Sequence, residues 1–232
     1  MKKRSPKKGP GGSFFSKLWY FIWKDDSIWS LLFDLALAFV IVKFIIYPAL
    51  EFGLDTSFPV VAVLTSSMEH KPQENNQLCG SHVEEYNKSF EGYWAVCGEW
   101  YKNHKISKEE FNSFPFHNGF NIGDILLIKG IPIDEYKIGD VAVFWADLEY
   151  PIIHRVVKID AKNNTISTKG DQNAGQLYHE QGISSDRVLG KAFFRIPYLG
   201  YIKVWASQLI GRIKSTNVNN NNNQPNLIIN QP

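Results

Sequence analysis

The apolar stretch from Ile28 to Leu50 constrains the fold more than any other feature of the sequence. A helix needs about 20 apolar residues to cross the hydrocarbon core of a bilayer, and this stretch is long enough. Two charged residues, Asp34 and Lys43, interrupt it, and each costs about 2.5–3.5 kcal/mol at the centre of a membrane and less near its ends. The alternative is a buried helix in a soluble core, but the flanking sequences favour a membrane anchor.

The charges on the two sides of this stretch predict its orientation. Lysine and arginine are concentrated at the N-terminus, whereas Glu51 and Asp55 follow the stretch. The positive-inside rule then places the N-terminus in the cytoplasm and everything after Leu50 outside. A cleaved signal peptide would need an apolar core of about 7–15 residues and small residues at its cleavage site, and neither is found here. We therefore expect an uncleaved, single-pass anchor in the cell membrane.

Four regions are predicted along the 232 residues. Positions 1–27 form a basic cytoplasmic tail with an interfacial segment, and positions 28–50 form the transmembrane anchor. Positions 52–214 form one extracytoplasmic domain of ordinary size, with an insertion at about 73–116 that breaks the strand pattern. The Asn-rich positions 215–232 are predicted to be disordered. The net charge of +2 argues against a nucleic-acid-binding protein, whose domain would be strongly basic.

Short β-branched and apolar segments predict a mainly β domain. Two Gly-Asp pairs, Gly123-Asp124 and Gly139-Asp140, each precede an apolar run, as turn residues do where a strand begins. This spacing of short strands favours a sheet folded back on itself. The expected strands are 58–64, 125–129, 141–145, 151–159, 165–169 and 188–196, and a short amphipathic helix is expected at 198–214.

The two cysteines, Cys79 and Cys97, both lie in the predicted extracytoplasmic domain, where a disulfide can persist. A bridge between them would close a polar, charged segment and stabilise it by about 3 kcal/mol through chain entropy. Metal binding is the alternative, with His82 and His104 nearby. Neither the spacing nor the ligand set matches a known zinc pattern, so we expect the disulfide and no metal.

Three polar residues on or next to strands are candidates for catalysis. Ser67 follows the first expected strand, His154 lies in the middle of an apolar strand, and Asp171 lies in a turn that contains glycine. A serine hydroxyl needs an adjacent base, a histidine can supply it near neutral pH, and a carboxylate can orient the imidazole. Taken singly, each is more often structural: a turn serine, a half-buried histidine and an Asx-turn former. Arg155 points away from His154 and is a candidate ion-pair partner.

The order of these motifs resembles that of the type I signal peptidase family (serine peptidase family S26), in its archaeal and endoplasmic-reticulum branch. In that branch a histidine replaces the bacterial lysine base. The resemblance covers roughly positions 28–205 apart from the insertion. It implies a mainly β, signal-peptidase (LexA-like) fold with one N-terminal transmembrane helix. The matching features are the anchor, Ser67-Met68, the two Gly-Asp pairs, His154-Arg155-Val156, Lys169-Gly170-Asp171 and Arg195 to Gly200.

This resemblance implies a role for each matching residue. Ser67 would be the nucleophile, His154 the general base and Asp171 the acid member of the site. Thr65, together with the backbone N–H of Ser67, would form the oxyanion hole. Loss of such a donor typically lowers the rate about 10²–10³-fold.

The chain also departs from the family pattern. A glycine is usual at Ser66 and a proline at His70. A second aspartate is usual six residues after that of the Gly-Asp motif, and Leu177 stands there. The acid member therefore stays open between Asp171 and two alternatives, Glu180 and Asp186.

The implied activity is that of a membrane-bound serine endopeptidase that removes signal peptides from exported preproteins after small residues, with no cofactor or metal. Its partners would be preproteins and the lipid bilayer, with the protein translocation channel as a further candidate and no nucleic acid. One alternative is a catalytically inactive, membrane-anchored, peptidase-like binding module, because Ser66, His70 and Leu177 depart from the pattern. Another is a self-cleaving or regulatory protease of LexA-like fold, against which the anchor argues.

Overall fold

The computed structural model describes residues 13, 27–146 and 150–197. Two compact units divide the chain, Met1–Gly53 and Leu54–Pro232. The basic tail, the expected helix at 198–214 and the Asn-rich end lie outside the described residues, apart from Ser13 and Ser27 of the tail.

The first unit contains a continuous helix in which α2, Ile28–Ile41, is followed by a π-helical turn, Val42–Ile46, and by α3, Tyr47–Leu54. The π-helical turn ends two residues before Pro48. Because proline has no N–H to donate to the preceding turn, a local widening of the helix is expected there. The ammonium of Lys43 lies 5.5 Å from the ring centroid of Phe39, so an aromatic face partly offsets its charge.

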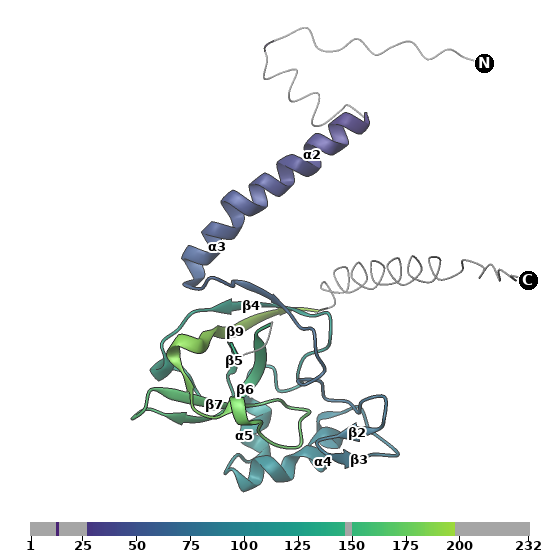
Figure 1. Cartoon of the computed structure of the whole chain (residues 1–232). Coiled ribbons are helices and arrows are strands. Elements are labelled where there is room, and N and C mark those ends of the chain that lie inside the picture. Colours follow the sequence, from purple (N-terminus) through teal and green to yellow (C-terminus); the bar gives the residue numbers. More distant parts are fainter. Residues whose placement is uncertain (1–12, 14–26, 147–149, 198–232) are drawn as a thin grey trace, which may run out of the picture. The chain divides into compact units, whose positions relative to one another are not determined.

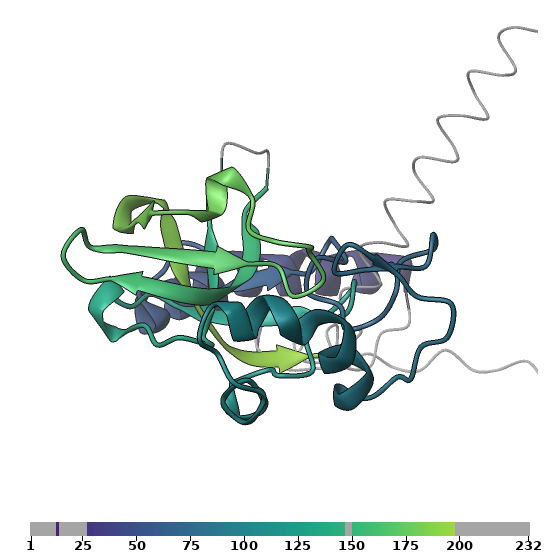
Figure 2. The same ribbon diagram turned by 90° about the horizontal axis from the view of Figure 1, so that it is seen from below.

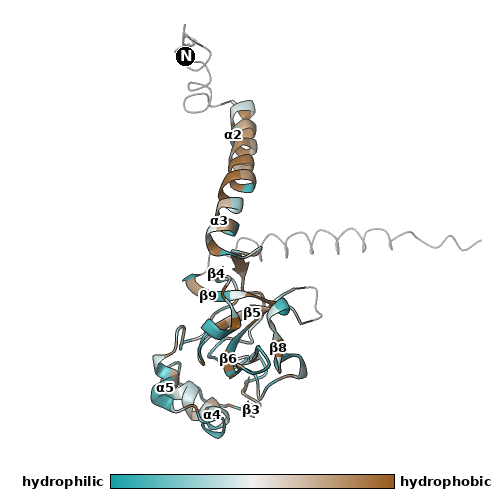
Figure 3. Ribbon diagram, turned by 90° about the vertical axis from the view of Figure 1, so that its left-hand side faces the viewer, coloured by the Kyte–Doolittle hydropathy of each residue, from teal (hydrophilic) through white to brown (hydrophobic). Residues whose placement is uncertain are grey.

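Most side chains of this helix are exposed. Most of its residues are apolar, as the brown colour of the helix in Figure 3 shows. From Ile28 to Leu54 it has 27 residues, more than the length needed to cross a bilayer. Over the ranges that the structure describes, it is the one helix long and apolar enough to do so. The predicted anchor is therefore a single apolar helix.

The second unit is built on one antiparallel sheet with the strand order β1-β4-β9-β5-β6-β7-β8 (Figures 1 and 2). The prediction of a mainly β domain is confirmed. Three strands have the expected bounds, three differ at their ends, and the very short β8 was not expected. The strands are β1 Val60–Ala62, β4 Ile125–Lys129, β5 Val141–Phe144, β6 Ile152–Asp160, β7 Thr165–Lys169, β8 Ile183–Ser184 and β9 Val188–Ile196.

Both Gly-Asp pairs form the turns that the sequence predicts. Gly123 and Gly139 have φ values of +88° and +94°, in the left-handed region that glycine adopts without steric cost. Asp140 accepts a hydrogen bond from the backbone N–H of Lys137 and pairs with Lys191 of β9 at 2.9 Å. The aspartate thus closes the turn and fastens it to a neighbouring strand.

The insertion folds into a small unit of its own, which contains the hairpin β2 Gln77–Leu78 with β3 Ser81–His82, and the helices α4 Phe90–Asn103 and α5 Lys108–Ser113. Ser89 and Ser107 cap the two helices with their hydroxyl groups, which accept backbone N–H donors of the first turn. A disulfide joins Cys79 to Cys97, which leaves no thiolate for a metal site there.

Aromatic side chains fill the interior of this insertion and attach it to the sheet. Val157 of β6 belongs to the same cluster. Gly139 lies so close to the ring of Phe114 that a side-chain carbon at this position would approach it to 2.2 Å. The cluster consists of Leu78, Tyr93, Trp94, Cys97, Tyr101, Ile106, Phe111, Phe114 and Val157.

Candidate active site

Ser67 lies in the loop that follows β1, and the two side chains nearest its hydroxyl are polar. Its Oγ is 2.9 Å from Nε2 of His154 and 3.2 Å from Oγ1 of Thr65. The next residue, Met68, is buried in the core of the sheet, which fixes the loop. The serine that sequence reasoning selected is therefore within hydrogen-bonding distance of the selected histidine.

His154 is the third residue of β6 and is almost completely buried. Its Nδ1 lies against Oε1 of Glu180, a residue of the 3₁₀ helix Tyr178–Glu180. A carboxylate only accepts hydrogen bonds, so Nδ1 carries the proton and Nε2 is left as the acceptor for the Ser67 hydroxyl. This is the arrangement of a serine with a neighbouring base that is itself oriented by an acid.

The carboxylate of Glu180 is completely buried, and both of its oxygens accept hydrogen bonds. Besides His154, it accepts the backbone N–H of Gly170 at 3.1 Å and that of Leu177. These donors hold the carboxylate in one orientation. Gly170 must also be small, because a side-chain carbon there would lie 2.8 Å from Nε2 of His154.

The Asp171 carboxylate does not contact the imidazole of His154. Its carboxylate forms a two-pronged ion pair with Arg155, at 2.9 Å to Nε and 2.7 Å to Nη2. Successive side chains of a strand point to opposite faces, so an acid that meets Arg155 on β6 cannot also meet His154. Asp186, the other alternative, is exposed at the surface. Of the three carboxylates considered, the structure brings Glu180 to the histidine.

The surroundings of Asp171 keep it ionised. Burial alone would raise the pKa of this carboxyl, but the Arg155 charge and the hydrogen bonds from His70 and Arg155 hold it well below its usual range. Tyr101 donates to Oδ1 at 2.9 Å, and burial together with Asp171 raises the pKa of this tyrosine well above its ordinary value. Tyr101 therefore stays a hydrogen-bond donor.

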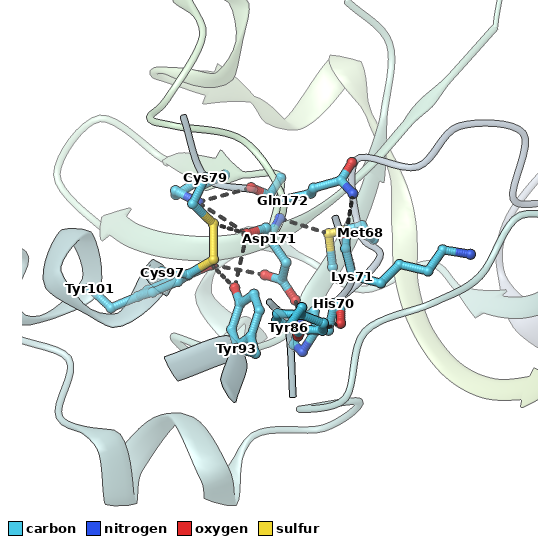
Figure 4. The surroundings of a disulfide bond; sticks show 12 residues. Met68, His70, Lys71, Cys79, Tyr86, Tyr93, Cys97, Tyr101, Asp171 and Gln172 are labelled. Atoms are coloured by element: carbon cyan, nitrogen blue, oxygen red, sulfur yellow. Dashed lines mark hydrogen bonds and ion pairs between the residues drawn. A yellow bond between two sulfur atoms is a disulfide. The ribbon is translucent and has the colours of Figure 1, made fainter. Parts of the chain in front are cut away.

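Three residues of this network were not selected from the sequence: His70, Tyr93 and Tyr101 (Figure 4). His70 lies 2.9 Å from Asp171 and is stacked on Tyr93 with ring centroids 3.6 Å apart. Burial lowers the pKa of His70, so the imidazole is neutral and donates through Nε2. The one sequence signal for His70 was its departure from the proline that is usual at this position. Its partner, Asp171, is shown only by the fold.

Removal of Arg155 should strongly destabilise the domain. The guanidinium is completely buried and also donates to the carbonyl groups of Pro115, Gly139 and Phe116, each at 2.9 Å. Arg155→Met would leave the Asp171 charge buried without its partner, which typically costs about 3–5 kcal/mol. We expect this loss in the free energy of unfolding, measured by denaturant titration of the full chain in detergent.

The control for Arg155→Met is Lys158→Met, which removes an exposed basic residue from the same strand. Surface substitutions of this kind usually change stability by no more than about 0.5 kcal/mol. Equal losses in the two variants would contradict the assignment of Arg155 as a buried structural partner.

An apolar groove of about 520 Å³ runs past Ser67 and His154. Alternation along β1 and the residues after it explains one wall, because Val61 and Val63 point into the core while Val60 and Leu64 are exposed. All of this wall comes from the segment 58–64, which was expected as a strand. Of the expected strand 141–145, only Trp145 lines the groove, because the β5 side chains are buried in the core.

The chain is similar to known catalytic subunits of signal peptidase complexes. The chain is 32% identical over 99 residues to the signal peptidase complex catalytic subunit SEC11 of Zygosaccharomyces rouxii, which covers 38% of this chain and 59% of the relative. It is 37% identical over 100 residues to SEC11 of Lachancea thermotolerans, with the same shares. Human SEC11C is 32% identical over 94 residues, or 37% of this chain and 49% of the relative.

No family model matches the chain. The matched stretch spans about half to three fifths of the length of these curated relatives. The similarity agrees with the fold of the chain, a mostly β domain and one N-terminal apolar helix. Over about 38% of its length, the chain is a homologue of the catalytic subunits of signal peptidase complexes.

Proposed function

We propose that the chain is a membrane-anchored serine endopeptidase that removes signal peptides from exported preproteins after small residues. The observation that carries the proposal is the hydrogen-bonded series from Ser67 through His154 to Glu180 at the wall of an apolar groove. The homology to signal peptidase complex catalytic subunits supplies the substrate class.

In the proposed reaction, Oγ of Ser67 attacks the scissile carbonyl while Nε2 of His154 takes its proton. Glu180 holds the imidazole through Nδ1 and stabilises the positive charge that forms on it. His154 then gives the proton to the leaving amine, and water hydrolyses the acyl-enzyme by the same route. Glu180 thus takes the role that sequence reasoning first gave to Asp171.

The oxyanion of the tetrahedral intermediate needs donors close to the nucleophile. The Thr65 hydroxyl, 3.2 Å from Oγ of Ser67, and the backbone N–H of Ser67 are proposed for this role. Thr65 is exposed, so it can turn toward a bound carbonyl.

The substrate is proposed to bind as an added strand. Among the strands that the structure describes, β1 pairs only with β4, so its other edge is proposed to accept an extended peptide. Side chains at the first and third positions before the bond would point into the groove. Phe58 and Trp145, whose rings meet edge to face at 5.8 Å, line the groove and would exclude large side chains.

The apolar helix supports placement of the enzyme at the membrane in which the signal peptide of the substrate resides. Holding both in one plane raises their effective concentration without new contacts. The basic residues before the helix favour a cytoplasmic N-terminus and an extracytoplasmic catalytic domain. In an organism with an endoplasmic reticulum, the lumen of that organelle is the equivalent side. The translocation channel is a proposed neighbour.

Substrate selectivity tests the proposal directly. With a model preprotein that has alanine at the first and third positions before the bond, we expect cleavage by the full chain in liposomes, mapped by mass spectrometry. Phenylalanine at the third position should lower kcat/KM about 10–100-fold, because it would overpack the groove. Phenylalanine at the second position is the matched control, since its side chain would point away from the groove.

The inactive binding module predicts a different outcome. Folded protein would bind the preprotein and leave it intact, with the same affinity for both phenylalanine substrates. Cleavage that is indifferent to residue size at the third position would instead favour a protease of broader specificity.

A further inference from the structure

The turn that follows β7 connects the insertion to the proposed catalytic residues. Its three consecutive backbone N–H groups donate to the proposed catalytic residues or to a neighbour of Ser67. Gly170 donates to Glu180 at 3.1 Å, Asp171 donates to Sδ of Met68 at 3.4 Å, and Gln172 donates to the carbonyl of Ser67 at 2.9 Å. A shift of this turn would therefore move the serine loop and the orienting acid together.

The insertion supplies hydrogen-bond donors to the acceptor groups of the same turn (Figure 4). The hydroxyl of Tyr93 donates to the Asp171 carbonyl at 2.9 Å, and that of Tyr101 donates to the Asp171 carboxylate at 2.9 Å. The backbone N–H of Cys79 donates to the Gln172 carbonyl at 3.0 Å. Donors from the insertion thus meet acceptors of the turn, while the donors of the turn face the active site.

The disulfide joins the two parts of the insertion that make these contacts. Cys97 lies on α4 between Tyr93 and Tyr101, and Cys79 lies at the end of the β2 strand. Both tyrosines are completely buried, and their rings pack in the aromatic cluster of the insertion. The rigid helix α4 therefore holds the two hydroxyl groups in place, which a mobile loop would not do.

Lys169 adds a second attachment of the same kind. Its ammonium lies 5.1 Å from the ring centroid of Trp100 and 4.9 Å from that of Tyr101, and it donates to the Gly170 carbonyl at 3.0 Å. Burial lowers the pKa of this lysine to about 8. The rings of Trp100 and Tyr101, both in the insertion, thus pack against the side chain of Lys169 from β7.

We propose that Tyr93 and Tyr101 are positioning residues of the active site, and that the disulfide-linked insertion serves to hold the turn at Gly170–Gln172. This inference rests on the proposed function for its catalytic readout. The insertion acts through the turn and does not touch the reacting atoms. A displacement of about 1 Å can lower the rate of a positioned reaction about 10²-fold.

The test compares Tyr93→Phe/Tyr101→Phe with wild type as full chains in detergent. Each substitution removes one hydroxyl and keeps the ring. We expect kcat to fall about 10–100-fold with KM within about twofold, because the groove is untouched. A Cys79→Ala/Cys97→Ala variant should shift kcat in the same direction.

Tyr136→Phe is the matched control. Tyr136 is a buried tyrosine of another part of the core, and its hydroxyl has no hydrogen-bond partner within the described part of the chain. The Tyr136→Phe variant should keep kcat within about twofold of wild type, because the substitution removes no hydrogen bond. Equal effects in Tyr136→Phe and in the double variant would overturn the proposal.

Hydrogen exchange gives a readout that does not depend on catalysis. In the double variant, the amides of Asp171 and Gln172 should exchange faster, while those of β5 stay protected. Unchanged exchange at these amides would overturn the proposal, even if no preprotein were cleaved. A wild-type chain that cleaves nothing would refute the proposed function alone. If the double variant does not fold, Tyr101→Phe alone provides both measurements.

Discussion

Replacement of Ser67 or of His154 by alanine should abolish preprotein cleavage, with a loss in kcat of about 10⁶-fold for either. Ser67→Ala removes the attacking oxygen, and His154→Ala leaves the hydroxyl without a base at the 2.9 Å distance that the structure provides. Because the two residues act as a unit, the double variant should be no slower than either single variant. Cleavage of a model preprotein in liposomes, followed by gel electrophoresis over hours, measures these rates.

Ser66→Ala is the control for this experiment, since it removes a neighbouring hydroxyl that has no part in the proposed reaction. Its rate should stay close to that of wild type. If Ser67→Ala trimmed preproteins at the normal rate, the proposed nucleophile would be wrong.

Replacement of Glu180 by glutamine should lower kcat about 10³–10⁴-fold, the loss expected when an orienting carboxylate is neutralised in a Ser-His-acid arrangement. The carboxylate accepts three donors, from His154, Gly170 and Leu177. The glutamine amide would present a donor to at least one of them and could not stabilise the imidazolium. Single-turnover cleavage rates would measure the loss separately from substrate binding.

Asp186→Asn is the matched control for Glu180→Gln, because this exposed carboxylate lies away from the imidazole. It should retain nearly full activity. Asp171→Asn should behave differently from both, since it leaves Arg155 without a charged partner and so lowers the free energy of unfolding. An Asp186→Asn variant as slow as Glu180→Gln would contradict the assignment of the acid.

Much of the sheet could be predicted from local patterns. Short apolar and β-branched segments predicted β4, β7 and β9 with their bounds, and a Gly-Asp pair marked the start of β4, because strand pattern and turn conformation depend on near neighbours in the chain. The insertion was harder. Its aromatic residues on α4 and α5 face one another only after the disulfide and the helix caps bring these segments together.

The length and apolar character of the anchor, the mainly β domain and the pairing of a strand-exit serine with a strand histidine all follow from the sequence. Each depends on helix length, on period-two alternation or on motif order. The choice of Glu180 over Asp171 did not follow, because both acids lie in polar loops of similar composition. Only the tertiary structure decided it: Asp171 meets Arg155 on the opposite face of β6, whereas the 3₁₀ helix at Tyr178–Glu180 returns a buried carboxylate to His154.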